Sequence, residues 1–109
     1  HHTSAKYPED VSEFSKTDFE PEYLDGFQAP FVKNAKVRLA CRFRNEYPIQ
    51  ENNTLLLFSE ILSIHLEDGI LESDGWLNLQ HAGSVTINGL DGYAKPELIE
   101  RFQYAKPTR

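Results

Sequence analysis

Side chains capable of catalysis or metal binding are sparse in this chain. Cys41 is the single cysteine, and it lies in an alternating segment among apolar residues, which favours a buried structural thiol over a nucleophile. His65 and His81 stand sixteen residues apart, and no spacing here resembles a zinc motif. We therefore predict no metal site, and we expect His65 to be solvated or hydrogen-bonded rather than a ligand or an acid–base group.

Most carboxylates occur in turn-like segments, where water solvates them. Glu60 differs, because it interrupts the most apolar segment of the chain. A carboxylate in that position needs a partner, and Arg38 or Arg42 on the preceding segment could supply it, so we expect a structural ion pair. The sequence contains no glycine-rich phosphate loop and no GxSxG motif.

Two consecutive segments have the pattern of long β-strands. From Lys36 to Arg44 apolar and charged residues alternate, with Val37, Leu39, Cys41 and Phe43 expected on the buried face. Thr54–Leu66 is the strongest strand signal, and a break in its pattern predicts a bulge near Ser59–Glu60. A polar turn over residues 48–53 joins the two.

The remaining elements are shorter. Asp68-Gly69 and Asp74-Gly75 predict turns, with short strands at residues 70–71 and 84–87 and helical turns at 76–81 and 96–102. A turn over residues 88–92 directly precedes Tyr93. Residues 1–34 form a loop region rich in proline and aromatic residues, with one short helix expected at Glu9–Phe14.

We therefore predict a single domain over residues 1–109, with an aromatic loop region at 1–34 and barrel strands plus a C-terminal tail at 35–109. The fold class is mainly β with short helices. We expect three or four strands, with one edge open and apolar residues on both faces. This pattern indicates part of a β-barrel rather than a closed one.

Composition excludes several classes of partner. The chain has 109 residues, of which 39% are hydrophobic and 26% charged, and a net charge of −6, which argues against nucleic acid. No apolar run approaches the roughly 18 residues of a membrane span, and one cysteine allows no internal disulfide. A reducing, cytoplasmic setting is expected. The chain starts at His1 and contains no methionine, so we expect a processed, trimmed or partial product.

Several phrases, taken in order, resemble flavin-reductase-like proteins of the flavoredoxin type. The matching segments cover nearly the whole chain. Their order and spacing are more specific to the family than any single segment. The phrases are Thr3-Ser4-Ala5-Lys6-Tyr7-Pro8 with Asp10–Phe14, Ala35–Cys41, Thr54–Ile61 with Ile64-His65 and the Asp68–Leu71 turn, and Gly89–Tyr93 with Arg101-Phe102 and Tyr104–Pro107.

This resemblance implies an FMN-binding split β-barrel that works as a homodimer, with the flavin near the subunit interface. Family members are considerably longer, and this chain corresponds to their C-terminal half. The flavin phosphate is held mainly by the other half, so the resemblance implies an incomplete site here. A complementing N-terminal half or a longer product would supply the rest.

The resemblance places Thr3, Ser4, Ala5 and Lys6 in a loop that approaches the flavin, where hydroxyl, N–H and ammonium groups suit its polar edge. An ordinary capping loop is the alternative. Tyr93 follows the glycine turn near the active site or interface, where its ring would stack on the flavin or simply pack.

The implied activity is electron transfer through bound FMN, as in NAD(P)H:flavin reductases, to a small-molecule or protein redox partner. Many short-form reductases carry a histidine and a glycine where this chain has Thr54 and Ser59, so use of NAD(P)H is in doubt and flavoredoxin-like members fit better. Two alternatives are a non-catalytic flavin- or ligand-binding module on the same scaffold and a structural dimerisation fragment.

Overall fold

The computed structural model describes residues 1–108, and Arg109, the last residue of the predicted tail, lies outside them. The chain divides into two compact units, His1–Glu67 and Asp68–Arg109. Each unit is mainly β-structure and turns, and each is described by itself.

The first unit opens with two short 3-10 helices, η1 (His2–Ser4) and η2 (Glu13–Lys16). The helix predicted at Glu9–Phe14 was wrong. Residues 8–11 instead form a turn, in which the N–H of Val11 donates to the Pro8 carbonyl over 3.0 Å. Ser12 caps η2 by accepting a hydrogen bond from the Phe14 N–H at 3.3 Å, so the helical turn begins only after this serine.

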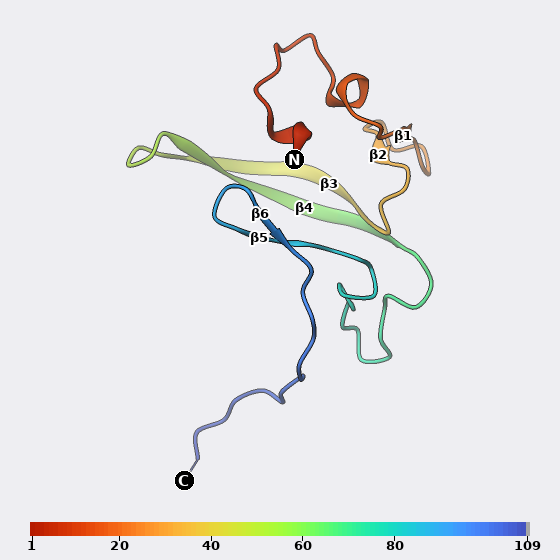
Figure 1. Ribbon diagram of the computed structural model, residues 1–109, viewed down its shortest axis with the longest axis vertical. Helices are drawn as coiled ribbons and strands as arrows, with labels where there is room; N and C mark the ends of the chain where they lie inside the picture. Colours follow the sequence, from red (N-terminus) through yellow and green to blue (C-terminus); the bar gives the residue numbers. More distant parts are fainter. Residues whose placement is uncertain (109) are drawn as a thin grey trace. The chain divides into compact units, whose positions relative to one another are not determined.

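A long antiparallel hairpin of β3 (Val37–Ile49) and β4 (Thr54–Leu66) dominates this unit. Figure 1 shows the two strands, yellow and green, running side by side over their full length. The predicted bounds of Thr54–Leu66 were confirmed. The turn is shorter than predicted, because Pro48 belongs to β3 and lies opposite Leu55. A proline is tolerated there because the two-stranded sheet leaves each strand an edge without a ladder partner.

Two register shifts bend the hairpin. Ser59 lies opposite Phe43 and Phe58 opposite Asn45, so Arg44 is the extra residue there. A second shift, between Ala40 and Cys41, leaves Leu62 without a counterpart on β3. An irregularity near Ser59 was predicted, although its extra residue is on the neighbouring strand.

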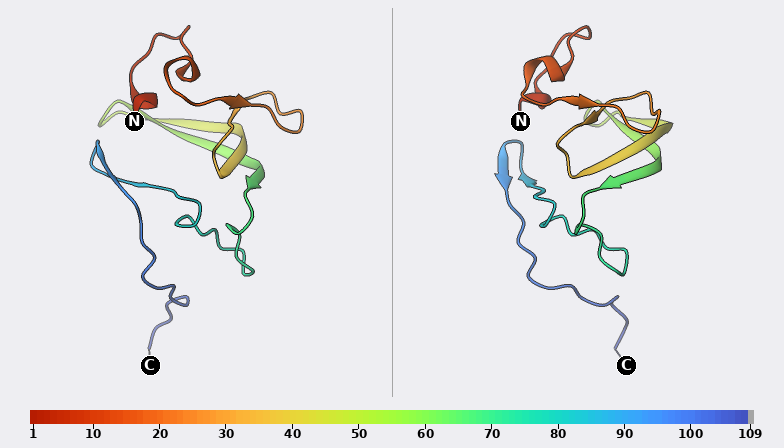
Figure 2. Two further views of the ribbon diagram at one scale, coloured as in Figure 1. Left: turned by 45° about the vertical axis from the view of Figure 1, so that its right-hand side comes forward. Right: turned by 90° about the vertical axis from the view of Figure 1, so that its right-hand side faces the viewer.

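A small hairpin of β1 (Pro21–Glu22) and β2 (Phe31–Val32) packs at the Val37 end of β3 (Figure 2). Arg38 of β3 forms an ion pair with Glu22. Phe31 is 7% exposed, and its ring lies 5.6 Å from Phe27 and 5.2 Å from His65, centroid to centroid. These contacts cover the face of β3 that carries Arg38, whereas the sequence pattern predicted the opposite face to be buried.

The second unit contains β5 (Thr86–Asn88) and β6 (Gly92–Ala94), joined by the predicted glycine turn. Residues 70–71 form no strand but a single antiparallel bridge, Leu71 to Leu77. Ile70, fully buried, is the core of this unit.

The helical turns predicted at 76–81 and 96–102 were wrong, since residues 68–108 contain no helix. The Asn78 side chain accepts a hydrogen bond from the His81 N–H at 2.9 Å and so fixes a turn. Pro96 and the residues after it have no regular structure.

The burial pattern is that of an unfinished barrel. The sheets described within residues 1–108 are all two-stranded, and the large apolar side chains of β4 remain open to solvent, with Leu57 60% and Phe58 50% exposed. The mainly β character of the chain is as predicted, and these uncovered strands agree with the expected incomplete barrel. Residues 1–108 include no helix with the length and apolar character needed to cross a membrane.

Candidate functional site

The Thr3–Lys6 loop lies at the start of the first unit, on η1 and directly after it. The Ser4 N–H donates to the His1 carbonyl over 3.0 Å, and the Ala5 N–H donates to the His2 carbonyl over 3.1 Å. The Tyr7 hydroxyl donates to the same His2 carbonyl at 3.3 Å, which closes the turn. The backbone of the loop is thus held in place by local contacts.

The side chains of this loop are available to a ligand. Thr3, Ser4 and Lys6 are exposed, and their polar side-chain atoms form no hydrogen bond with any residue from 1 to 108. Two hydroxyls and an ammonium group next to one another can donate hydrogen bonds to carbonyl or anionic oxygens. This donor set is chemically suited to the polar edge of a flavin.

Thr3 also lines an open hollow of about 560 Å³ in the first unit, together with residues of η2 and the segment after it. Lys16, at the end of η2, contributes an ammonium group to this hollow, and Phe19 contributes an apolar side chain. Asp18 contributes a carboxylate to the same hollow. No sequence motif singles out Lys16, because its position depends on the turn that brings η2 back beside η1.

Tyr93 lies in the second unit, on β6, opposite Ile87 of β5. The residue is 45% exposed. The predicted site residues therefore fall into two groups, the contiguous Thr3–Lys6 loop in one unit and Tyr93 in the other.

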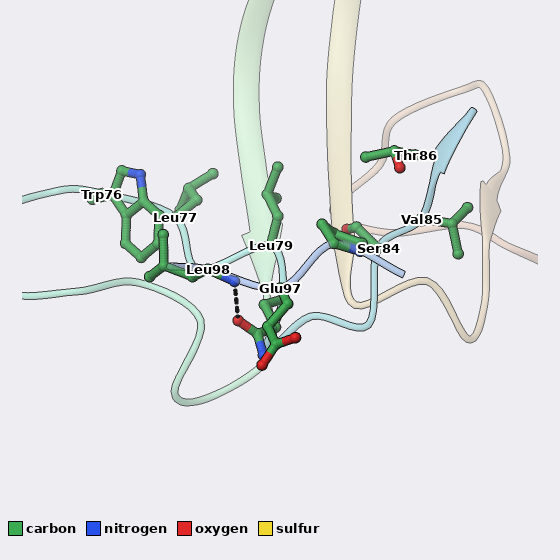
Figure 3. A pocket seen from close by; sticks show the side chains of 10 residues that line it. Trp76, Leu77, Leu79, Ser84, Val85, Thr86, Glu97 and Leu98 are labelled. Atoms are coloured by element: carbon green, nitrogen blue, oxygen red, sulfur yellow. Dashed lines mark hydrogen bonds between the residues drawn. The ribbon is translucent and has the colours of Figure 1, made fainter. Parts of the chain in front are cut away.

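The second unit has an apolar groove of about 310 Å³ that the sequence analysis missed. Figure 3 shows Trp76, Leu77, Leu79 and Leu98 among the side chains that line it. The Leu98 N–H donates to the Gln80 side-chain carbonyl over 2.8 Å, the dashed line in the figure. The single tryptophan, Trp76, was the one sequence feature that could have indicated this groove. Its neighbours in the groove could not be predicted, because they include residues from a segment without regular structure.

Three polar residues of the first unit resemble a catalytic relay in type but not in geometry. The Ser63 hydroxyl oxygen lies 3.5 Å and the Asp25 carboxylate 3.8 Å from the same atom of His65, Nε2. A serine–histidine–aspartate relay needs the hydroxyl and the carboxylate on opposite ring nitrogens. His65 is therefore a half-buried packing residue with polar neighbours, in agreement with the sequence prediction.

Two further predictions concern β3. Cys41 is exposed, so the prediction of a buried thiol was wrong. The covering hairpin packs on the other face of β3, and the register shifts between Ala40 and Cys41. Glu60 forms an ion pair with Arg42 at 3.0 Å, as predicted, and a second with Arg44 at 2.5 Å. Arg38, the other candidate, binds Glu22 instead.

In the described part of the chain, no three histidine, cysteine, aspartate or glutamate side chains gather in a way that could hold a metal ion. The polar groups that could hold a ligand are the hydroxyls and ammonium groups around Thr3.

A solved structure from Shewanella frigidimarina NCIMB 400, provisionally assigned as a flavin reductase with a split barrel domain, superposes on 94% of this chain. The TM-score is 0.88 and the sequence identity 36%. The chain belongs to the flavin reductase-like split-barrel family. Nitrilotriacetate monooxygenase component B from Bacillus cereus has the same fold, with a TM-score of 0.74 and 23% identity over 94% of the chain.

An uncharacterised protein of Aquifex aeolicus (strain VF5) is 32% identical over 90 residues, or 83% of this chain. No family model matches the sequence. This split-barrel chain spans about half the length of the proteins it resembles, covering 52% and 51% of the two solved chains and 44% of the Aquifex protein.

Proposed function

We propose that the complete protein is an FMN-dependent redox protein of the flavin-reductase type, and that this chain supplies its C-terminal half. The observation that carries the proposal is the 36% identity and TM-score of 0.88 to the Shewanella split-barrel protein over 94% of the chain. The chain covers only 52% of that protein, which supports a site completed by other polypeptide.

The proposed contribution of the first unit is the Thr3–Lys6 loop. The Thr3 and Ser4 hydroxyls would donate hydrogen bonds to the polar edge of the flavin ring. Ala5 would hold the loop in place, because its N–H donates to the His2 carbonyl. Lys6 would place a positive charge beside the ring and stabilise the negative charge of the reduced form. Bound FMN would supply the redox chemistry, and the chain would supply orientation and electrostatics.

Tyr93 is proposed to face the flavin or the subunit interface from the second unit. An aromatic ring of this kind can stack on a flat ring system. The Tyr93→Phe variant would keep stacking and remove the hydroxyl, whereas Tyr93→Ala would remove both.

We propose a small-molecule or protein redox partner and a cytoplasmic location, with NAD(P)H as a candidate electron donor. Thr54 and Ser59 stand where many short-form NAD(P)H-dependent members have histidine and glycine. A donor other than a nicotinamide nucleotide, as in flavoredoxin-like members, is therefore the first to assay.

The direct test is to purify the product of the complete gene, add FMN, remove unbound flavin and record the visible spectrum. Flavin absorption bands that stay with the protein would support the proposal, and their absence would refute it. Photometric assays with ferric or flavin acceptors, first with a donor other than a nicotinamide nucleotide and then with NADH and NADPH, would establish whether electrons pass through the bound flavin.

A non-catalytic role is the second candidate, and the exposed apolar faces of the β3–β4 hairpin favour it. Leu55, Leu57, Phe58 and Ile61 are each at least half exposed and would be buried by another chain in a dimer. Under this reading the complete protein is an obligate dimer or a binding module that retains the fold. Turnover with any electron donor would exclude it.

A further inference from the structure

The segment that follows β6 lacks regular structure yet is attached to the rest of its unit. Pro96 is half-buried, whereas residues 97–108 are exposed. Within this segment the Leu98 N–H donates to Gln80 at 2.8 Å, and Arg101 contacts both Asp74 and Trp76. We call residues 96–101 the strap, and these contacts are its attachment points.

Arg101 makes two different contacts with the loop beneath it. Its Nη2 atom lies 2.6 Å from Asp74 Oδ2, and its guanidinium carbon lies 4.2 Å from the centre of the Trp76 ring. The Trp76 N–H in turn donates to Asp74 Oδ1 at 3.2 Å, so the carboxylate is anchored by the backbone of its own turn. A planar guanidinium can stack on an aromatic face and pair with a carboxylate at the same time, which an ammonium group does less well.

The strap also forms one wall of the apolar groove. Pro96, Glu97 and Leu98 line it together with Trp76, Leu77 and Leu79. Moving the strap away would remove this wall and expose the opposite one to water. The groove therefore exists only while the strap is attached.

We propose that Arg101 is a latch: its joint contact with Asp74 and Trp76 holds the strap closed over the apolar groove, and breaking that contact releases the strap. Both contacts are polar or electrostatic and partly exposed, with 42% of the Arg101 side chain and 55% of the Asp74 side chain open to solvent. Each contributes modestly, so the strap opens reversibly while the buried Ile70 core stays folded. The inference does not depend on flavin binding.

The sequence provides a direct readout of strap opening. Trypsin cleaves poorly before proline, and Lys95 and Lys106 are both followed by proline, so Arg101–Phe102 is the tryptic site of the segment from 95 to 108. The Arg101 guanidinium must leave Asp74 and Trp76 to enter the specificity pocket of trypsin. Cleavage after Arg101 in the full-length protein thus measures the open population when opening is faster than cutting.

The experiment is limited trypsin digestion of the full-length protein, with mass spectrometry of the peptide that begins at Phe102. The rate is divided by that of a synthetic peptide of the same sequence, which gives a protection factor. The unmodified protein should be protected, and Asp74→Asn should be cleaved about two- to fivefold faster, because it loses the ion pair. Asp91→Asn removes an equal charge in a turn away from the latch and should leave the factor unchanged.

Arg101→Lys is the second variant, because it retains a tryptic site and the positive charge but loses the planar stacking group. It should be less protected than the unmodified protein, relative to its own peptide. Cleavage of the unmodified protein as fast as the peptide would overturn the proposal. So would equal protection in Asp74→Asn, Arg101→Lys and the Asp91→Asn control. If Asp74→Asn is cleaved faster at every tryptic site of the protein, its fold is damaged. The protection factor of Arg101→Lys then decides whether the latch exists.

Discussion

Arg42 of β3 and Glu60 of β4 lie directly opposite each other in the hairpin register, with Arg42 Nη2 3.0 Å from Glu60 Oε2. The register shift at Arg44 brings a second guanidinium to 2.5 Å from the same oxygen. One carboxylate therefore pairs with both Arg42 and the bulged residue Arg44. Opposite charges across an antiparallel pair stabilise the ladder locally.

Replacing Glu60 with glutamine should have a small effect. The side chain is 39% exposed, and exposed ion pairs contribute about 0.2–1 kcal/mol, so we expect the free energy of unfolding to fall by about 1 kcal/mol or less. Urea denaturation of the full-length protein measures this change in the free energy of unfolding. The difference between the variant and the unmodified protein should become smaller at high salt. A loss above about 3 kcal/mol would mean that the pair is fully buried in the complete protein.

Replacing Ile70 with alanine should cost much more. This side chain is fully buried, and truncating a buried isoleucine typically costs about 2–5 kcal/mol through lost burial and the cavity left behind. Thermal or urea unfolding of the variant gives the value. The matched control is Leu90→Ala, in the turn before β6, where the side chain is 93% exposed. Equal destabilisation by both changes would contradict the assignment of Ile70 as the core.

The latch should weaken in acid. The hydrogen bond from Arg101 holds the pKa of the Asp74 carboxyl below its usual value of 3.8. A pKa lowered by folding means that the contact is complete above the unfolded value and is lost as the pH falls through the folded one. In a carboxyl titration by NMR, Arg101→Gln should move the Asp74 pKa upward. An unchanged midpoint would show that the two side chains are not paired in solution.

Replacing Lys6 with glutamine should weaken FMN binding by about tenfold if the ammonium group contacts the flavin, because charged hydrogen bonds are the stronger class. The midpoint potential of the bound flavin should also become more negative, since a cation beside the ring favours its reduced, anionic form. Fluorescence titration and spectroelectrochemistry of the full-length protein measure the two effects. Lys106→Gln, in the tail, is the control, and equal behaviour of the two variants would remove Lys6 from the site.

The sequence pattern predicted the parts of the fold whose signal is local. Thr54–Leu66 was found with its exact bounds, because thirteen residues of nearly continuous apolar and β-branched pattern leave few alternatives. The glycine turn before Tyr93 and the pairing of Glu60 with Arg42 were also recovered from short-range chemistry.

The sequence predictions failed where contacts between residues far apart in the sequence determine the local structure. The covered face of β3 is the one that Arg38 occupies, since Glu22 and Phe31 from a separate hairpin pack there, and alternation alone could not identify it. The segment from Pro96 to Phe102 has helix-forming residues but is held in an irregular conformation by contacts with Gln80 and Asp74. Local propensity is a weak guide where tertiary contacts oppose it.

The most direct test of this account compares FMN binding by the complete gene product with binding by residues 1–109 alone, using visible absorption after removal of unbound flavin. We predict stable flavin bands in the complete protein and none in the isolated segment. A complete protein that retains no flavin would contradict the proposed function.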